Sequence, residues 1–441
     1  MFSAIREVKR VRLGGGWLLF AVCALVAGAC TTDVTVATGS ATTTTTTTHA
    51  PSTGVVSSST TRTGGTTPTL DSSPWSRVPH DESVFGGAGH QQMWSVSRGE
   101  LGLVAVGWDG SGGDFDAAVW TSPDGVVWTR VPHDEEVFGG AQDQVMRIVI
   151  EGGPGLVAVA GDESGGNFDA AVWTSPDGIV WTRVPHDEEV FGGAGFQEIL
   201  SVTIGGPGLV AVGLDESGGD RDAAVWTSPN GVVWTRVPHD EVLLGGTGHQ
   251  NMFSVAVAGP GLVAVGVDGS GGDRDAAVWT SSDGVTWNRV QDDGTVLGGA
   301  GDQEMMSVTV GGPGLVAVGS DGSGNDFDAA VWTSSDGVVW TRVSHDEAVF
   351  GGPGIQAMVT VTEGGPGLVA VGVDGPGGED AAIWTSSDGF AWTRVPHDEA
   401  VFGGPGNQMM LGVTVGESGL VVVGRDDLEG DRDAAVWVLE D

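Results

Sequence analysis

A repeated His-Asp-Glu triplet and a series of acidic loops hold the side chains best suited to chemistry. The triplets begin at His80, His133, His186, His239, His345 and His397. Imidazole and carboxylate groups in such proximity are typical of metal sites and of general acid–base pairs. Each triplet is expected to follow the outermost strand of a repeat, about 14 Å from the innermost one, so the six cannot share one ion. We therefore favour a capped or salt-bridged loop.

Seven Gly-rich acidic loops supply further oxygen ligands, as in the segment 109–116, DGSGGDFD. Several carboxylates on a flexible loop suit Ca²⁺, although the spacing is not that of an EF-hand and no Glu stands at a fixed offset. A solvated hairpin is the favoured interpretation and a calcium site is the alternative. The candidate calcium ligands are Asp109, Asp114, Asp116, Asp162, Asp169, Asp215, Asp220 and Asp222.

These groups belong to a repeat that occupies the chain from residue 74 onward. One Trp recurs at positions 120, 173, 226, 279, 332, 384 and 437, which are 53 residues apart except for one step of 52. Each repeat contains four short runs rich in β-branched and aromatic residues, separated by Gly-rich turns, and no run has helical periodicity. In the second repeat the predicted strands are 144–150, 156–160, 170–174 and 179–184. Repeats of this length and composition predict the four-stranded blades of a β-propeller.

The two ends of the repeat region predict a closed ring. The region begins at Trp75 with a fourth strand that lacks its third, and it finishes at 434–439 with a third strand that lacks its fourth. The N-terminal strand is therefore expected to complete the last blade, because closure removes long unpaired sheet edges. The predicted fold is all-β, a single seven-bladed propeller over residues 74–441.

The turn after each third strand resembles the Asp box of sialidase-like propellers, also called the BNR repeat. That pattern is Ser, any, Asp, any, Gly, any, Thr, Trp, and the segment 281–287 reads SSDGVTW. The matching residues are Ser122, Asp124, Gly125, Trp128, Asp177, Trp181, Asp283, Trp287, Asp336, Trp340, Asp388 and Trp392. Here the pattern is one residue shorter between Asp and Gly, and only Thr286 fills the Thr position. The resemblance covers residues 74–441 and implies the propeller fold, in which this box is structural.

Candidate ligand-binding residues are expected on the face that holds the acidic loops and the connections between blades. A Gln begins the innermost strand of every repeat, and Gln91, Gln144, Gln250 and Gln303 are candidates at the channel mouth, although a residue present in every blade is usually scaffold. Residues that break the repeat are better candidates, since aromatic groups stack on sugar rings or on a partner's side chains. They are His90, Trp94, Trp108, Phe196 and His249. Core filling is the alternative role.

Because sialidases share the resemblance, hydrolysis is an activity to consider, but the sequence argues against a sialidase site. Sialidases use a Tyr nucleophile and three Arg residues, whereas this chain has no Tyr and most of its Arg residues are either repeated or flanked by Asp. A glycosidase with two carboxylates needs no Tyr. The number of acidic residues prevents the sequence from identifying or excluding such a pair.

The N-terminus predicts export and a lipid anchor. Residues 1–12 are basic, residues 17–29 are apolar, and the segment 25–30, LVAGAC, resembles the lipobox of bacterial lipoproteins. We expect a signal peptide at 1–29, lipidation of Cys30, and a Thr/Ser/Gly-rich disordered tether at 30–73. An ordinary cleaved signal peptide is the alternative. The expected location is extracytoplasmic, at the bacterial cell membrane or surface.

The formal net charge of −40 limits the partners. Such an excess repels polyanions, so nucleic acid is excluded and membrane contact is expected through the lipid alone. The sequence favours a monomeric, non-catalytic surface protein that binds a glycan or a protein through its acidic face. A glycoside hydrolase of the sialidase-like propeller class and a purely structural envelope protein are the alternatives.

Overall fold

The protein is described by a computed structural model that covers residues 74–259, 261–291, 294–324, 326–365, 367–375, 380–428 and 430–440. The predicted signal peptide, Cys30 and the tether lie outside the described residues. Every regular element within these ranges is a strand. Nothing in the described part of the chain forms a helix with the length and apolarity to cross a membrane.

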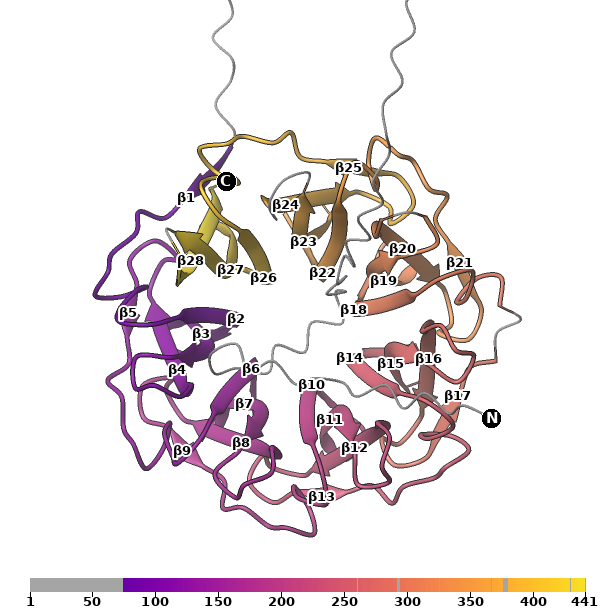
Figure 1. Ribbon diagram of the computed structural model, residues 1–441, viewed down its shortest axis with the longest axis horizontal. Helices are drawn as coiled ribbons and strands as arrows, with labels where there is room; N and C mark the ends of the chain where they lie inside the picture. The colour runs from indigo at the N-terminus through magenta and orange to yellow at the C-terminus, as the bar shows by residue number, and fades with distance from the viewer. Residues whose placement is uncertain are drawn as a thin grey trace, which may run out of the picture. The chain divides into compact units, whose positions relative to one another are not determined.

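Seven four-stranded antiparallel sheets form a ring around a common centre, as predicted (Figure 1). Blade 1 contains β2 (Gln91–Gly99), β3 (Gly102–Asp109), β4 (Asp116–Ser122) and β5 (Thr129–Arg130). Blade 2 contains β6 (Gln144–Gly152), β7 (Gly155–Asp162), β8 (Asp169–Ser175) and β9 (Thr182–Arg183). Blade 3 contains β10 (Gln197–Gly205), β11 (Gly208–Asp215), β12 (Asp222–Ser228) and β13 (Thr235–Arg236). Blade 4 contains β14 (Gln250–Ala258), β15 (Gly261–Asp268), β16 (Asp275–Ser281) and β17 (Trp287–Arg289).

The remaining blades follow the same order, with the first-named strand innermost (Figure 1). Blade 5 contains β18 (Gln303–Gly311), β19 (Gly314–Asp321), β20 (Asp328–Ser334) and β21 (Trp340–Arg342). Blade 6 contains β22 (Ile355–Gly364), β23 (Gly367–Gly375), β24 (Asp380–Ser386) and β25 (Trp392–Arg394). Blade 7 contains β26 (Gln408–Val415), β27 (Gly419–Leu428), β28 (Asp431–Glu440) and, as its outer strand, β1 (Trp75–Arg77).

The first strand closes the ring as predicted. Trp75, Ser76 and Arg77 of β1 pair with Leu439, Val438 and Trp437 of β28. Blade 7 differs from the others because β27 and β28 extend through its acidic segment, where Asp427 pairs with Arg432. The two strands of blade 7 therefore continue through the acidic segment as far as Leu428 and Asp431.

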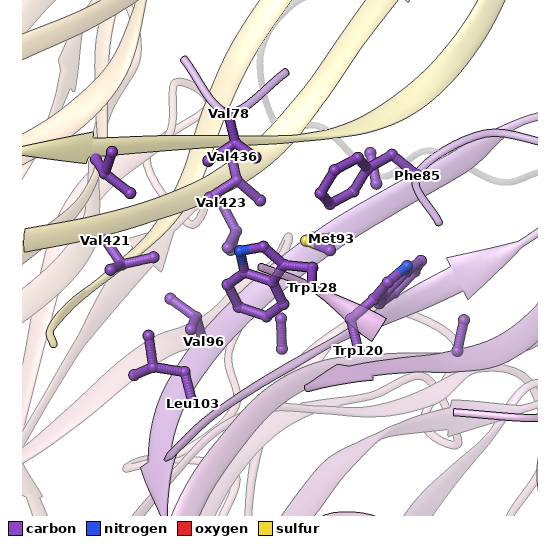
Figure 2. Packing of buried hydrophobic residues seen from close by; sticks show 14 residues of the cluster. Val78, Phe85, Met93, Val96, Leu103, Trp120, Trp128, Val421, Val423 and Val436 are labelled. Atoms are coloured by element: carbon purple, nitrogen blue, oxygen red, sulfur yellow. The ribbon is translucent and has the colours of Figure 1, made fainter. Parts of the chain in front are cut away.

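The hydrophobic core lies between neighbouring blades rather than within any one of them. In Figure 2, Met93, Val96 and Trp120 of blade 1 pack against Val421 and Val423 of blade 7. Six similar clusters fill the interfaces between the other pairs of neighbouring blades. The Trp on each third strand is fully buried, and its indole N–H donates to a carbonyl of the preceding inter-blade connection, as Trp279 does to Leu243 at 2.8 Å. The repeated Trp thus binds each connection to the blade that follows it.

A bulge in every innermost strand shapes the inner end of each blade. In β2 the register shifts between Met93 and Ser95, which leaves Trp94 as the extra residue. A Cβ on Gly107 of β3 would collide with the carbonyl oxygen of Gln92, so glycine permits the close approach of the two strands here.

Candidate functional site

The acidic loops and the connections between blades lie together on one face of the ring, named here the acidic face. In blade 1, Gln91 pairs with Asp109 and Asp109 with Asp116 at this end of the sheet. The Gly99–Gly102 turn and the end of β4 at Ser122 lie at the opposite end, which forms the turn face. The division between the two faces is the one that the alternating strand directions predict.

On the turn face, each Ser-x-Asp-Gly segment forms a tight turn held by its own side chains. The Asp283 carboxylate accepts the amides of Val285 and Thr286 at 2.9 and 2.7 Å. Ser281 Oγ accepts the Gly284 amide at 2.9 Å, and the Trp287 indole donates to the Gly284 carbonyl. The backbone hydrogen bonds lower the pKa of Asp283 to about 2. These side chains stabilise the turn.

The repeated Gln side chains form hydrogen bonds within the scaffold of each blade. Gln91 is fully buried, and its amide donates to Asp109 at 2.8 Å. Asp109 also pairs with Arg130, which lies over the Trp120 ring. Burial acts to raise the pKa of Asp109, but hydrogen bonds from Ser111 and Gln91 and the charge of Arg130 hold it below its ordinary value. Gln144, Gln250 and Gln303 are likewise buried and donate to Asp162, Asp268 and Asp321.

The candidate calcium ligands divide among three environments instead of gathering at one point. Those at the end of each second strand bind the repeated Gln and Arg: Asp109, Asp162 and Asp215. Those at the start of each third strand face a His: Asp116, Asp169 and Asp222. Asp114 and Asp220 lie between them, partly exposed in the loops. The two carboxylates that bound each acidic loop are therefore cross-strand neighbours whose side chains bind different partners.

The His-Asp-Glu triplets fold back onto the third strand of their own blade. His239 Nε2 lies 3.2 Å from Glu241 Oε2 and 3.6 Å from Asp222 Oδ2. The central Asp of the triplet caps its own turn, where Asp240 accepts the Val242 amide at 3.0 Å. Burial raises the pKa of Asp222, and that of Asp116 in blade 1, to about 6. Each triplet therefore combines a capped turn with contacts between its His and two carboxylates.

Two residues that break the repeat, His90 and Trp108, both lie against Arg432 near the junction of blades 7 and 1. Trp108 is buried, with its ring centroid 4.2 Å from that of Phe115, and Arg432 lies 6.0 Å from the Trp108 ring. His90 is exposed, and its Nδ1 accepts the Arg432 amide at 3.1 Å. Trp108 thus has the core-filling role, whereas Phe115 and His90 reach the surface.

A second aromatic group joins blades 2, 3 and 4 on the acidic face. The rings of Phe168 and Phe196 are stacked, with centroids 4.5 Å apart and an interplanar angle of 4°. Arg221 lies 5.8 Å from the Phe196 ring, and the exposed His249 accepts the Arg221 amide at 3.3 Å. Both Phe rings are half-buried, so part of each remains available to a partner.

Trp94 belongs to a charged arrangement that spans three blades. It is half-buried at the bulge of β2, and the Arg147 guanidinium of β6 lies 4.5 Å from its ring centroid. Arg147 Nε also donates to Oε1 of Glu198 on β10, a carboxylate that is 1% exposed. The sequence identified Trp94 but neither Arg147 nor Glu198.

The sequence also gave no indication of a second buried carboxylate, Glu304. Glu304 of β18 is fully buried, and Arg274 Nη1 lies 2.8 Å from its Oε1, although this N–H does not point at the oxygen well enough for a hydrogen bond. Arg274 also donates to Asp302 at 2.8 Å. Burial raises the pKa of Glu304 to about 7 despite the nearby Arg274. A carboxyl group that exchanges its proton near neutral pH is a feature of functional sites and of buried structural groups alike.

The buried polar residues Gln92, Glu198, Asn251 and Glu304 share one position of the repeat, the residue that follows the repeated Gln. The same position holds Val145, Ala357 and Met409 in the other three blades. Gln92 Nε2, Asn251 Oδ1 and both Glu304 oxygens are buried without a hydrogen-bond partner, which is rare unless water or a ligand supplies one. The sequence signal that could have revealed these residues is the change from an apolar to a polar side chain at one position of an otherwise regular repeat.

Glu304 is expected to make stability fall as pH rises. Its folded pKa lies above its ordinary value, so the folded state binds more protons between about pH 4.5 and 7 and is less stable at higher pH. In the turns, Asp283 has a lowered pKa and therefore has the opposite effect: the stability that it contributes is lost as the pH falls toward that pKa. Denaturant midpoints measured from about pH 3 to 8 should therefore peak near pH 4–5. Glu304→Gln should flatten part of the neutral side of the curve, because the raised pKa values of Asp116 and Asp222 act in the same direction. A midpoint that rises steadily to pH 8 would contradict this assignment.

Hollows on the turn face are too small to be the main binding site. One of about 80 Å³ is lined by Arg98, Glu100 and Glu417 among others, and one of about 150 Å³ by Leu101, Thr129 and Ile179 among others. Small-molecule sites usually measure about 300–1,000 Å³. The acidic face, which carries the half-buried Phe168–Phe196 stack, is the surface that we consider as a candidate binding site.

Comparison with solved structures finds sialidase and glycoside hydrolase propellers. The Trypanosoma rangeli sialidase in its covalent complex with 2,3-difluorosialic acid is 13% identical, with a TM-score of 0.44 over 83% of this chain and 59% of that one. A candidate glycoside hydrolase of Parabacteroides distasonis is 11% identical, with a TM-score of 0.33 over 84% of this chain and 97% of that one. A thermostable family-43 glycoside hydrolase is 12% identical, with a TM-score of 0.33 over 62% and 97%.

These likenesses concern the fold alone. This chain spans less than two thirds of the sialidase's length. Known protein families and curated proteins give no match to the sequence.

Proposed function

We propose that this protein is a cell-surface lipoprotein whose propeller binds a glycan or a protein ligand, without catalysis, through its acidic face. The observation that supports it most is the Phe168–Phe196 stack with Arg221 beside it, because all three come from loops and leave apolar surface open to solvent. Stacked aromatic rings flanked by Arg suit a sugar ring or a partner's apolar side chain.

The charge of the chain narrows the ligand class. With a formal net charge of −40, a polyanionic ligand would be repelled, whereas a neutral glycan or a cationic protein surface would not. We propose no nucleic-acid partner and a monomeric propeller. Calcium remains a proposal for the acidic loops, where it would use carboxylates that the scaffold leaves free, such as Asp114 and Asp220.

The test is a broad glycan array probed with the Cys30→Ser protein, with and without Ca²⁺, on which retained protein and released sugar are both measured. We expect retention without release, and a loss of at least about tenfold in affinity for Phe196→Ala. Val285→Ala, which changes an exposed residue of the turn face, is the matched control and should bind normally. Retention that Phe196→Ala leaves intact would place the binding surface elsewhere, and release of sugar would refute the non-catalytic assignment.

Glycoside hydrolysis is the second candidate function, and the buried Glu304 supports it. A carboxyl group with a pKa of about 7 is protonated often enough at neutral pH to act as a general acid. Its complete burial requires an opening before any substrate reaches it. Released sugar that disappears in Glu304→Gln would establish this function in place of the first.

The proposed lipid anchor is tested by the same Cys30→Ser substitution in cells. A lipid on Cys30 would hold the protein in the membrane fraction, because the propeller itself offers a strongly acidic surface that anionic lipids repel. We expect the wild-type protein in the membrane fraction and the variant in the soluble extracytoplasmic fraction. Fractionation that gives the same result for both proteins would instead favour an ordinary cleaved signal peptide.

A further inference from the structure

Six of the seven blades carry a compact cluster of one imidazole and two carboxylates at the outer edge of the acidic face. The His and the Glu come from an inter-blade connection and the Asp from the start of a third strand. The clusters are His80/Glu82/Asp433, His133/Glu135/Asp116, His186/Glu188/Asp169, His239/Glu241/Asp222, His345/Glu347/Asp328 and His397/Glu399/Asp380.

The distances within each cluster suit a small cation. The His Nε2 to Glu Oε2 distance is 3.1 Å at His133 and 3.2 Å at His239, and the His Nε2 to Asp Oδ2 distances are 3.9 and 3.6 Å. Zinc bonds of about 2.0–2.2 Å in a tetrahedron place ligand atoms roughly 3.3 Å apart. Small side-chain rotations would therefore bring all three atoms to one ion.

Two of the clusters also contain a buried carboxylate oxygen that has no hydrogen-bond partner. The Asp169 and Asp222 side chains are 9% and 8% exposed, and the Oδ1 atom of each is buried without a hydrogen bond. A buried carboxylate oxygen that receives no hydrogen bond is costly, and a cation at the cluster would compensate its charge.

A glycine keeps room for the groups of each cluster. A Cβ on Gly245 would lie 3.0 Å from Glu241 Oε2, 3.0 Å from His239 Cε1 and 3.1 Å from Asp222 Oδ1. Five equivalent glycines, including Gly86 and Gly139, are similarly close to the Glu carboxylate of their own cluster. A side chain at these positions would displace the Glu from the His and the Asp.

We propose that each of these six clusters binds one divalent transition-metal ion of the zinc class, through the His Nε2 and one oxygen from each carboxylate. Imidazole nitrogen is a common ligand for such ions, whereas Ca²⁺ requires six or more oxygens. The His and the Glu are exposed enough for an ion to enter, and water would complete its coordination. The metal would fasten each connection to the blade that it leaves, while the buried Trp fastens it to the blade that follows.

Blade 4 provides an internal comparison. Positions 292 and 294, which correspond to the His and the Glu of the other repeats, hold Asp and Gly. This blade therefore lacks the nitrogen ligand and one carboxylate. The proposal accordingly requires six zinc ions for each chain and not seven.

The test is equilibrium dialysis of the full-length protein against Zn²⁺ with excess Mg²⁺ at about 0.15 M salt, followed by elemental analysis. We expect about six zinc ions per chain, one for each cluster. His239→Ala should lose one, and the variant with all six His replaced should lose all of them. Glu136→Gln, which removes an exposed carboxylate beside a triplet but outside the cluster, is the matched control and should lose none.

Two results would overturn the proposal. Fewer than one zinc ion per chain would show that the clusters are hydrogen-bonded loops alone. Zinc that survives replacement of all six His, or that Mg²⁺ displaces, would show diffuse binding to the acidic surface. If the His variants fold poorly, Co²⁺ bound to the unmodified protein gives a second readout, because visible absorption typical of four- or five-coordinate nitrogen and oxygen ligation is required.

Discussion

Trp279→Ala should lower the free energy of unfolding by about 3–5 kcal/mol, the range for truncating a large aromatic side chain in a core. The Trp279 side chain is fully buried between blades 3 and 4, where it packs with Val210, Val212 and Leu262. Its loss also leaves the Leu243 carbonyl of the connection without the indole donor. Urea denaturation followed by circular dichroism measures the change.

Val285→Ala is the control for this prediction. Val285 lies on the turn face and is 48% exposed, so its truncation should change stability by no more than about 0.5 kcal/mol. A Trp279→Ala variant that loses less than about 1 kcal/mol would mean that the connection and the blade core adjust independently of each other.

Arg147→Met should be the second most damaging change, with a loss of about 3–5 kcal/mol. Arg147 donates to Glu198, which is 1% exposed, and it also lies against Trp94. Removing the guanidinium leaves a buried carboxylate without its charged partner. The unfolding free energy from urea titration at neutral pH gives the magnitude.

The matched comparison is Arg221→Met, which breaks a pair with Glu216 that is more accessible to water. That change should cost less than about 1 kcal/mol, because exposed ion pairs contribute little. Adding Glu198→Gln to Arg147→Met should recover at least about 1 kcal/mol, since a neutral amide is less costly to bury. A double variant as unstable as Arg147→Met alone would attribute the loss to packing against Trp94.

Much of the propeller follows from the sequence because its repeats are local and regular. The spacing of Trp120 and its equivalents predicts seven blades, and the unpaired strands at the two ends predict the pairing of β1 with β28. The fourth strands are shorter than predicted: β9 contains Thr182 and Arg183, whereas residues 179–184 were expected. Asp177 accepts the amides of Ile179 and Val180 and so holds these residues in the turn.

The candidate site was less predictable because its contacts cross between blades. The partners Arg147 and Glu198 are 51 residues apart, and no repeat pattern links an Arg in one blade to a Glu in the next. The hydrogen bond of Gln91 could not be predicted for a related reason. The strand order places Gln91 beside the channel. The acceptor of its side-chain hydrogen bond, Asp109, lies opposite it because of the register between β2 and β3, which the strand order does not determine. The Phe168–Phe196 stack likewise depends on how neighbouring blades are oriented.

The pairing of β1 with β28 also sets an order of events when the chain is made. The first strand of the propeller has no partner until the last strand has been synthesised, so blade 7 cannot be completed while the chain is still growing. Until then Trp75 and the apolar residues of blade 7 that it contacts, such as Val422 and Trp437, cannot form a buried cluster. Contacts between such distant parts of a chain form slowly. The nascent ring is thus open at one junction, where a chaperone or an unwanted strand has its longest opportunity to bind.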